Sequence, residues 1–206
     1  MKNTAIAAML LVMLAVPLTA ALPPSAEALK AELTRRKKKV AVPVAVPTVQ
    51  ATPSPAPTPM IEPGSFEGRL LAAHNIERKR LGIAPLTWNR ALSSQAAQWA
   101  TTLASKGLFE HSQNRGNVGE NLWMGTSGYY TPEQMIGAFI GERQYFRPGK
   151  FPDVSSTGKW ADVGHYTQLI WPGTQQLGCA KATGAGKDVL VCRYFPAGNV
   201  MGQRVP

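Results

Sequence analysis

Proline and aromatic residues divide this chain sharply, and the division limits which part of it can fold. From residue 22 to residue 63 the sequence is rich in Pro, Ala, Val and Thr, with VPVAVPTVQATPSPAPTPM at its centre. Because proline removes backbone donors and favours extended conformations, we expect this segment to be a disordered, semi-rigid linker. All five Trp, all five Tyr and all six Phe lie at or after Phe66. We therefore expect one domain over residues 64–206, roughly 140 residues and a usual domain size.

The N-terminus has the layout of a secretory signal peptide, which we place at residues 1–21. Lys2 precedes an apolar stretch over residues 5–18, and small residues follow. That stretch is short for a membrane-spanning helix, which needs roughly 20 residues. An uncleaved anchor is the alternative. Two cysteines also agree with export, because an even cysteine count in an exported chain usually forms disulfides. We predict a protein that is secreted or associated with the cell envelope.

The positive charge of the chain is unevenly placed. The net charge is +10, and Lys2 together with residues 22–63 holds seven of the 22 basic residues. A run of five, RRKKK at 35–39, suits contact with an anionic envelope surface, although such runs are more often solvated spacers. No interleaved aromatic residue or nucleic-acid-binding motif accompanies it, so we expect no nucleic-acid partner, and we expect a monomer.

Within the domain, three helical patterns precede a group of strand patterns. Apolar residues at helical spacing predict helices over 65–81 and 89–106, the second capped by Asn89 and ended by Gly107. TPEQ at 131–134 predicts the capped start of a third helix, running to residue 145 or 146. Short β-rich runs at 165–171, 177–183 and 188–195 predict strands. Helices followed by strands, rather than strict alternation, indicate an α+β domain with an antiparallel sheet.

The last two predicted strands form a hairpin around GAGK at 184–187. If Thr183 faces Asp188, then Cys179 faces Cys192, four residues further from the turn on each strand. Opposed residues of an antiparallel pair have the short Cβ separation that a disulfide requires. The sequence therefore predicts a Cys179–Cys192 disulfide, worth about 3 kcal/mol in the chain-entropy model.

Glu142 is a carboxylate at an unusual place in the third helix. Helical spacing puts Glu142 on one face with large apolar residues, Met135, Phe139 and Phe146. A carboxylate on an inward face is costly unless it meets a cation, several donors or a metal. We favour a functional position. The alternative is a residue at the edge of the face that pairs with Arg143 or Arg147.

Three further polar residues are candidates for a site, and each has an ordinary structural explanation. Glu120 in GNVGENLW either satisfies backbone amides or points into a cleft. His111 follows the second helix, where a loop histidine is unremarkable. In the predicted strand, alternation puts His165 on one face with Leu169 and Trp171, as for a hydrogen-bonded core histidine. No HExxH, P-loop or GxSxG motif is present.

Four segments together resemble the CAP superfamily, which comprises cysteine-rich secretory proteins, antigen 5 and plant pathogenesis-related class 1 proteins, and whose domain is also called SCP. The segments are GHYTQLIW (164–171), VLVCRYFPAGN (189–199), HNIER (74–78) and GENLW (119–123). Their order and spacing agree with the family over about residues 66–204. The additional cysteines common in plant and animal members are missing, as is the cysteine-rich extension of the animal secretory proteins.

The resemblance implies a three-layer α-β-α sandwich with a central cavity lined by two His and two Glu. Carried over position by position, these are His111, Glu120, Glu142 and His165. Family members hold a divalent metal, often zinc, between the histidines, which implies zinc or another divalent metal at His111 and His165 with the two glutamates nearby. His74, Asn75 and Arg78 match the family outside the cavity, and we expect them to form framework hydrogen bonds.

Three functions follow as hypotheses. The first, which we favour, is a binding module for a lipid, a glycan or a protein partner, since the CAP fold persists without one agreed reaction. The second is a metal-dependent hydrolase acting on peptides or esters, in which a histidine acts as base or ligand and a glutamate orients water. Its weak point is the nucleophile, because Ser112 is only adjacent in sequence to His111. The third is an envelope-tethered structural protein.

Overall fold

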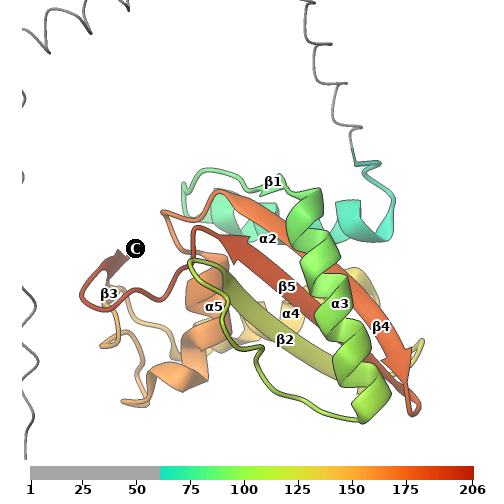
Figure 1. The fold of residues 1–206 in the computed structure, drawn as a ribbon. Coiled ribbons are helices and arrows are strands. Elements are labelled where there is room, and N and C mark those ends of the chain that lie inside the picture. The colour runs from blue at the N-terminus through green and yellow to red at the C-terminus, as the bar shows by residue number, and fades with distance from the viewer. Residues whose placement is uncertain (1–60) are drawn as a thin grey trace, which may run out of the picture. The chain divides into compact units, whose positions relative to one another are not determined.

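The structure is a computed structural model that describes residues 61–206. The predicted signal peptide and almost all of the predicted linker therefore lie outside the described residues. A four-stranded sheet lies at the centre of the domain (Figure 1). In spatial order its strands are β1 (Thr87–Trp88), β4 (Gln176–Gly184), β5 (Lys187–Phe195) and β2 (Gly119–Thr126).

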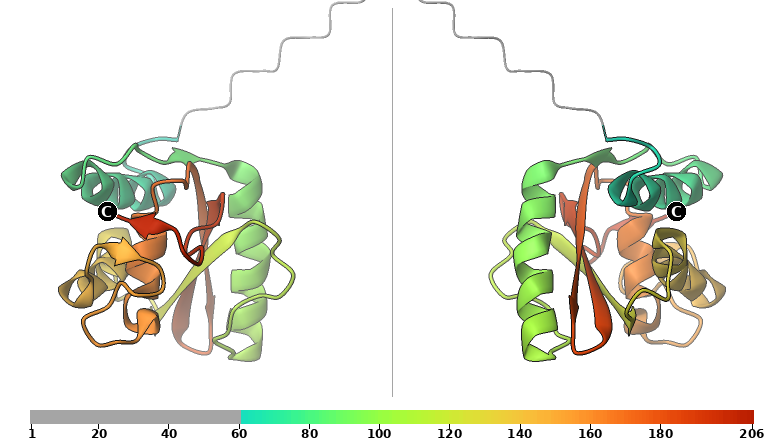
Figure 2. Two further views of the ribbon diagram at one scale, coloured as in Figure 1. Left: turned by 90° about the vertical axis from the view of Figure 1, so that its left-hand side faces the viewer. Right: turned by 90° about the vertical axis from the view of Figure 1, so that its right-hand side faces the viewer.

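Helices cover both faces of this sheet, and the edge-on views show the three layers directly (Figure 2). One face carries α3 (Arg90–Lys106), whose alanines and Leu103 pack against Leu122, Val189 and Val191. The helices of the other face are α2 (Phe66–Arg80), α4 (Pro132–Gly141) and α5 (Gly164–Leu169). These helices share a second core with the sheet. The predicted α-β-α sandwich is confirmed, with one difference: the short β1 pairs with β4 in parallel.

The smaller elements connect these layers. Two 3₁₀ turns, η1 (Glu142–Tyr145) and η2 (Trp160–Val163), flank the segment between α4 and α5. A two-stranded sheet joins β3 (Gly149–Lys150) to β6 (Arg204–Val205) near the C-terminus. None of the described helices has the length and apolar character needed to cross a membrane.

Local signals in the sequence predict the helix starts well. Asn89 accepts a hydrogen bond from the backbone of Leu92, and Gly107 ends α3 with φ 63°. Thr131 and Gln134 form the expected capping box at the start of α4. The third helix is shorter than predicted, because the α-helix stops at Gly141 and a 3₁₀ turn continues the chain.

The hairpin is also confirmed. Thr183 pairs with Asp188 and Cys179 with Cys192, and the two cysteines form a disulfide. The two residues at the tip of the turn, Ala185 and Gly186, both have positive φ, as a two-residue hairpin turn requires.

The prediction of a strand over residues 165–171 is wrong: this segment forms α5 (Gly164–Leu169). The physical reason is a long-range cap, because a carboxylate oxygen of Glu142 accepts the backbone N–H groups of both His165 and Tyr166. The Thr167 hydroxyl adds a bond to the Val163 carbonyl, one turn earlier. These contacts outweigh the β-propensity of the segment. The predicted face shared by His165, Thr167, Leu169 and Trp171 does not exist in a helix.

Arg78 is a buried framework residue that fixes the chain on both sides of the α5 C-terminus. Its guanidinium donates to the carbonyls of Leu169, Trp171 and Thr174 and to that of Ala84. Four carbonyl partners, rather than a carboxylate, hold this charge in the core. The predicted framework role of Arg78 is thereby confirmed.

Candidate functional site

The four predicted site residues form two His–Glu pairs. His111 Nδ1 lies 2.7 Å from Glu120 Oε1, and His165 Nδ1 lies 2.5 Å from Glu142 Oε1. A carboxylate oxygen only accepts hydrogen bonds, so each Nδ1 must carry the proton. In its neutral form each imidazole then has an Nε2 lone pair, and no hydrogen bond to either Nε2 is formed by the part of the chain that the structure describes.

Glu120 is the buried member of the first pair. It lies on β2 opposite Arg193 of β5, and its side chain has no exposed surface. Oε1 accepts from His111, the Ser112 amide and Arg115, while Oε2 accepts from the Ser112 hydroxyl and forms an ion pair with Arg193. Glu120 thus satisfies a backbone amide, which is the structural role suggested for it, and it also orients His111.

Opposing effects act on the ionisation of Glu120. Burial raises the pKa of this carboxyl, but the hydrogen bond from His111 and the charges of Arg193 and Arg115 lower it by more. The pKa therefore lies below its ordinary value, and the carboxylate stays charged at neutral pH. Ser112 donates its hydroxyl to this carboxylate and to no described histidine, so it does not form a Ser–His pair with His111.

Glu142 orients the second pair from the C-terminal end of α4. One of its oxygens binds the His165 ring and the other binds the first amides of α5. The His165 ring also stacks on Phe139, with centroids 5.1 Å apart and an interplanar angle of 15°. The alternative prediction paired Glu142 with Arg143 or Arg147, but Arg143 binds Glu77 instead. Glu142 thus fixes both the position and the tautomer of His165.

Both histidines line one cavity of about 620 Å³ at the edge of the sandwich. Glu120 lines it as well, whereas Glu142 lies behind His165. The His111 side chain is 51% exposed and that of His165 35%, so both rings are accessible to a ligand. Trp160 and Met201, two exposed apolar residues, also line the cavity.

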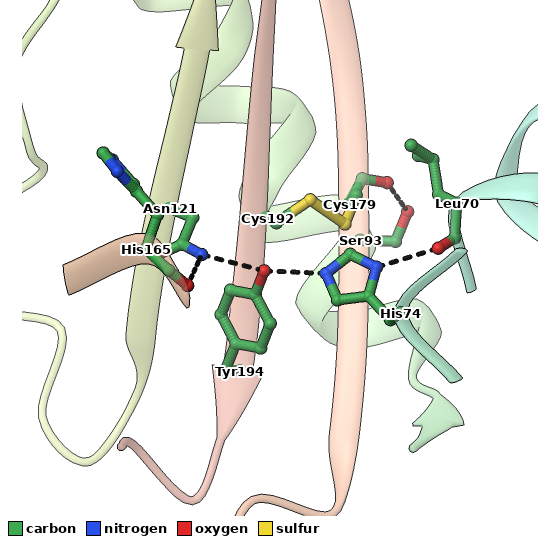
Figure 3. The surroundings of a disulfide bond; sticks show 8 residues. All are labelled: Leu70, His74, Ser93, Asn121, His165, Cys179, Cys192 and Tyr194. Atoms are coloured by element: carbon green, nitrogen blue, oxygen red, sulfur yellow. Dashed lines mark hydrogen bonds between the residues drawn. A yellow bond between two sulfur atoms is a disulfide. The ribbon is translucent and has the colours of Figure 1, made fainter. Parts of the chain in front are cut away.

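A chain of hydrogen bonds connects the backbone of His165 to α2, on the same face of the sheet (Figure 3). The Asn121 amide donates to the His165 carbonyl at 3.0 Å and to the Tyr194 hydroxyl at 3.2 Å. The Tyr194 hydroxyl in turn lies 2.8 Å from His74 Nε2, and His74 Nδ1 lies 2.8 Å from the Leu70 carbonyl. Because that carbonyl can only accept, His74 donates from Nδ1 and accepts from Tyr194. The chain confirms the framework role predicted for His74.

Sequence reasoning missed three residues of this arrangement: Asn121, Arg193 and Tyr194. Asn121 and Tyr194 hold the backbone of His165, and Arg193 holds Glu120. Only the register of β2 on β5 would have identified the buried ion pair, because it places Glu120 opposite Arg193. Nothing local to either strand specifies that register.

The side chains available to a metal are limited. Within residues 61–206, no group of three His, Cys, Asp or Glu side chains is arranged to hold an ion. The two glutamates are engaged by histidines and amides, so the free donors are the two Nε2 atoms. Imidazoles with carboxylates behind them as orienting partners are a donor type that divalent metals accept.

The sandwich and its disulfide-bridged hairpin define a domain of the CAP fold. The model of the cysteine-rich secretory protein family, CAP, matches residues 71–194. The chain belongs to this family.

Relatives and solved structures agree. Pathogenesis-related protein 1B of Nicotiana tabacum is 34% identical over 134 residues, covering 65% of this chain and 76% of that protein. The Golgi-associated plant pathogenesis-related protein 1 of Homo sapiens is 32% identical over 141 residues, covering 67% and 87%. Among solved structures, the crystal structure of NaASP2 with Zn²⁺ matches with a TM-score of 0.59 at 25% identity, covering 72% of this chain and 88% of that one.

Proposed function

We propose that this domain is a secreted binding module whose cavity holds a divalent metal, zinc in the first instance, between His111 and His165. One observation carries the proposal: the Nδ1–H of each imidazole donates a hydrogen bond to a carboxylate, so both Nε2 lone pairs are left for a metal. A carboxylate behind a ligating histidine fixes its tautomer and raises its basicity. A histidine with a purely structural role needs no such carboxylate, so two His–Glu pairs at one cavity favour a role in binding a metal.

The number of protein ligands determines what such a metal could do. Structural zinc sites are usually closed by four protein ligands, and catalytic ones keep three with one open position. A site with two imidazoles leaves further positions to water or to oxygen atoms of a bound ligand. When bound, the metal would supply a positive charge and open coordination positions for such an oxygen. NaASP2, a relative of the same fold, has been crystallised with Zn²⁺, which supports zinc as the first metal to test.

The cavity walls indicate the character of the bound ligand. Trp160 and Met201 are 45% and 64% exposed beside the polar His–Glu pairs. An amphipathic ligand, such as a lipid with a polar head or a glycan with an apolar face, could contact both kinds of surface. Solvent extraction of the purified protein followed by mass spectrometry tests for a retained ligand of this kind.

Zinc titration of the full-length chain tests the metal proposal. We expect binding by the wild type and a loss of at least about tenfold in affinity for His111→Ala and for His165→Ala, since each removes one of two ligands. Gln113→Ala is a matched control, because Gln113 lines the same cavity but is no ligand. Equal affinity in the wild type and both histidine variants would contradict the proposal.

The same variants decide between the binding module and the hydrolase. We expect no turnover of a peptide and ester panel that depends on either histidine. Turnover lost in His111→Ala or His165→Ala but kept in Gln113→Ala would show that the cavity is catalytic and overturn the binding function.

We also propose that the protein is exported and that its basic linker contacts an anionic envelope surface. The support is the signal-like layout of residues 1–21 and the RRKKK run at 35–39. Deleting residues 22–63 while keeping the signal segment should release the domain from the cell surface into the medium. Unchanged surface retention would contradict the role of the linker.

A further inference from the structure

A second cavity of about 480 Å³ lies on the other side of the loop that carries Ser112 and Arg115. Its walls are one face of α3, the segment 112–118 that runs beside this helix (Figure 2), and Arg193 of β5. The segment 112–118 contributes residues to both cavities, whereas residues of α3 line only the new one of the two. A volume of this size suits a small molecule.

The charge of this cavity is positive. Its lining contains Arg115 and Arg193 and no acidic residue. Both guanidinium groups share one nearby carboxylate, Glu120, at 3.2 Å and 3.1 Å, and Glu120 also accepts from His111. Two cationic groups beside a single, already shared carboxylate leave an excess of positive charge that an anionic ligand could neutralise.

Arg193 also has an unused donor. The side chain is only 8% exposed, and its Nε is buried without a hydrogen-bond partner among the described residues. A buried donor left unsatisfied costs about 1–3 kcal/mol, so native proteins seldom keep one without a reason. Because this Nε itself has no accessible surface, a ligand carboxylate would bind the Arg115 and Arg193 groups where they line the cavity. Charge-assisted bonds between Arg and carboxylate are among the strongest that proteins make.

The remaining walls favour a sugar over a simple ion. Gln95 and Gln98 present amides that can donate or accept, and the Thr102 hydroxyl, which donates to the Gln98 carbonyl, can still accept. Trp99 lies beside them, and its indole N–H is bonded to the Glu110 carbonyl, so the ring is held in a fixed orientation. Several neutral hydrogen-bonding groups around a fixed aromatic ring suit a polyhydroxylated ring with both polar edges and an apolar face.

We propose that this second cavity binds a carboxylate-bearing saccharide, such as a uronic acid unit, with its carboxylate at Arg193 and Arg115 and its hydroxyl groups against α3. The site is distinct from the His–Glu cavity and needs no metal. It therefore stands or fails independently of the zinc proposal.

The test is a titration of the full-length, isotope-labelled chain with two disaccharides followed by NMR in the presence of a chelator. Cellobiouronic acid carries a carboxyl group where cellobiose carries a hydroxymethyl group, so the pair isolates the carboxylate. We expect the acid to bind at least about tenfold more tightly, with shifts concentrated at residues 95–102 and 112–115. Acetate alone should bind weakly, because it lacks the ring.

Variants of the cavity wall test the assignment of residues. Arg115→Gln should weaken binding of the acid about tenfold or more. Lys106→Gln is the charge-matched control, at the exposed end of α3 and outside the cavity lining, and should bind as the wild type does. Gln98→Ala changes no charge or buried ion pair and should weaken both disaccharides, which keeps the test valid if Arg115→Gln folds poorly.

Several results would overturn the proposal. These are equal binding of the two disaccharides, shifts located elsewhere, or undiminished binding in both Arg115→Gln and Gln98→Ala. Acetate or an acidic dipeptide binding as tightly as the uronic acid would overturn the assignment to a saccharide. Loss of binding in His165→Ala would show that the ligand occupies the His–Glu cavity instead.

Discussion

Replacing Glu142 by Gln removes one negative charge and alters the pairing with His165. The carboxylate accepts three N–H groups: the His165 ring at 2.5 Å and two backbone amides at 2.9 and 3.0 Å. A glutamine has one accepting oxygen. If that oxygen stays on the amides, the glutamine NH₂ faces His165 Nδ1, and the ring must move its proton to Nε2 to accept this donor. The substitution therefore blocks the atom that we assign to the metal.

The expected magnitudes follow from these contacts. A hydrogen bond to a charged group contributes about 1.5–3 kcal/mol and a neutral one about 1 kcal/mol, so the exchange costs roughly 0.5–2 kcal/mol per bond. Since Glu142 is partly exposed, we take about 2 kcal/mol for the three bonds together. For a domain of this size, a loss of about 2 kcal/mol lowers the melting temperature by roughly 5 °C. Loss of a carboxylate behind a ligating histidine weakens metal binding about 10–100-fold.

Thermal unfolding and zinc titration of the same samples measure both effects. Glu110→Gln is the matched control, because Glu110 is exposed and precedes His111 directly. It should change stability by less than about 0.5 kcal/mol and leave zinc affinity unaltered. If Glu142→Gln binds zinc as tightly as the wild type, then the orientation of His165 by Glu142 does not matter for the metal and our reasoning is wrong.

Three further predictions concern stability. Burial lowers the pKa of His74 from 6.5 to about 4, against the effect of its hydrogen bond to Leu70. As the pH falls, the unfolded state therefore binds a proton first, and the free energy of unfolding should fall by about 3 kcal/mol between pH 6.5 and pH 4. His74→Gln should flatten that part of a denaturation–pH profile, and an unchanged slope would refute the assignment. The variant Cys179→Ala/Cys192→Ala should lose about 3 kcal/mol in denaturant unfolding and become insensitive to reductant, and a sensitive double variant would contradict this. At Gly178 an added Cβ would lie 2.3 Å from a backbone nitrogen of α3, so Gly178→Ala should destabilise the domain in thermal unfolding. Gly137→Ala in α4 meets no atom within 4 Å and should stabilise it by up to about 1 kcal/mol, and the reverse order would show that α3 is not packed so closely on β4.

The parts of the fold that sequence predicts best are those determined by neighbouring residues. Asn89 and Thr131 cap the helices that follow them, and the hairpin register follows from a short turn that also aligns the cysteines. The segment 164–169 was mistaken for a strand because its helix depends on Glu142, which lies more than 20 residues earlier. A cap supplied over such a distance leaves no trace in local propensity.

The site was predictable only in part for the same reason. The unusual position of Glu142 was visible from helical spacing, and resemblance to the CAP superfamily supplied His111, Glu120 and His165 as a set. Their grouping into two pairs could not be read from spacing, since it depends on how β2, α4 and α5 meet. Arg193 was missed because its role depends on the pairing of β2 with β5.

The proposed metal site requires two histidines that share one tautomer, and NMR of the ring nitrogens measures this most directly. In a long-range ¹H–¹⁵N spectrum above pH 7.5, we predict that His111 and His165 are both protonated at Nδ1. Addition of Zn²⁺ should then shift the Nε2 resonances of both rings and leave those of His74 unaltered. Protonation at Nε2 in either ring, or a zinc response confined to one histidine, would contradict the account.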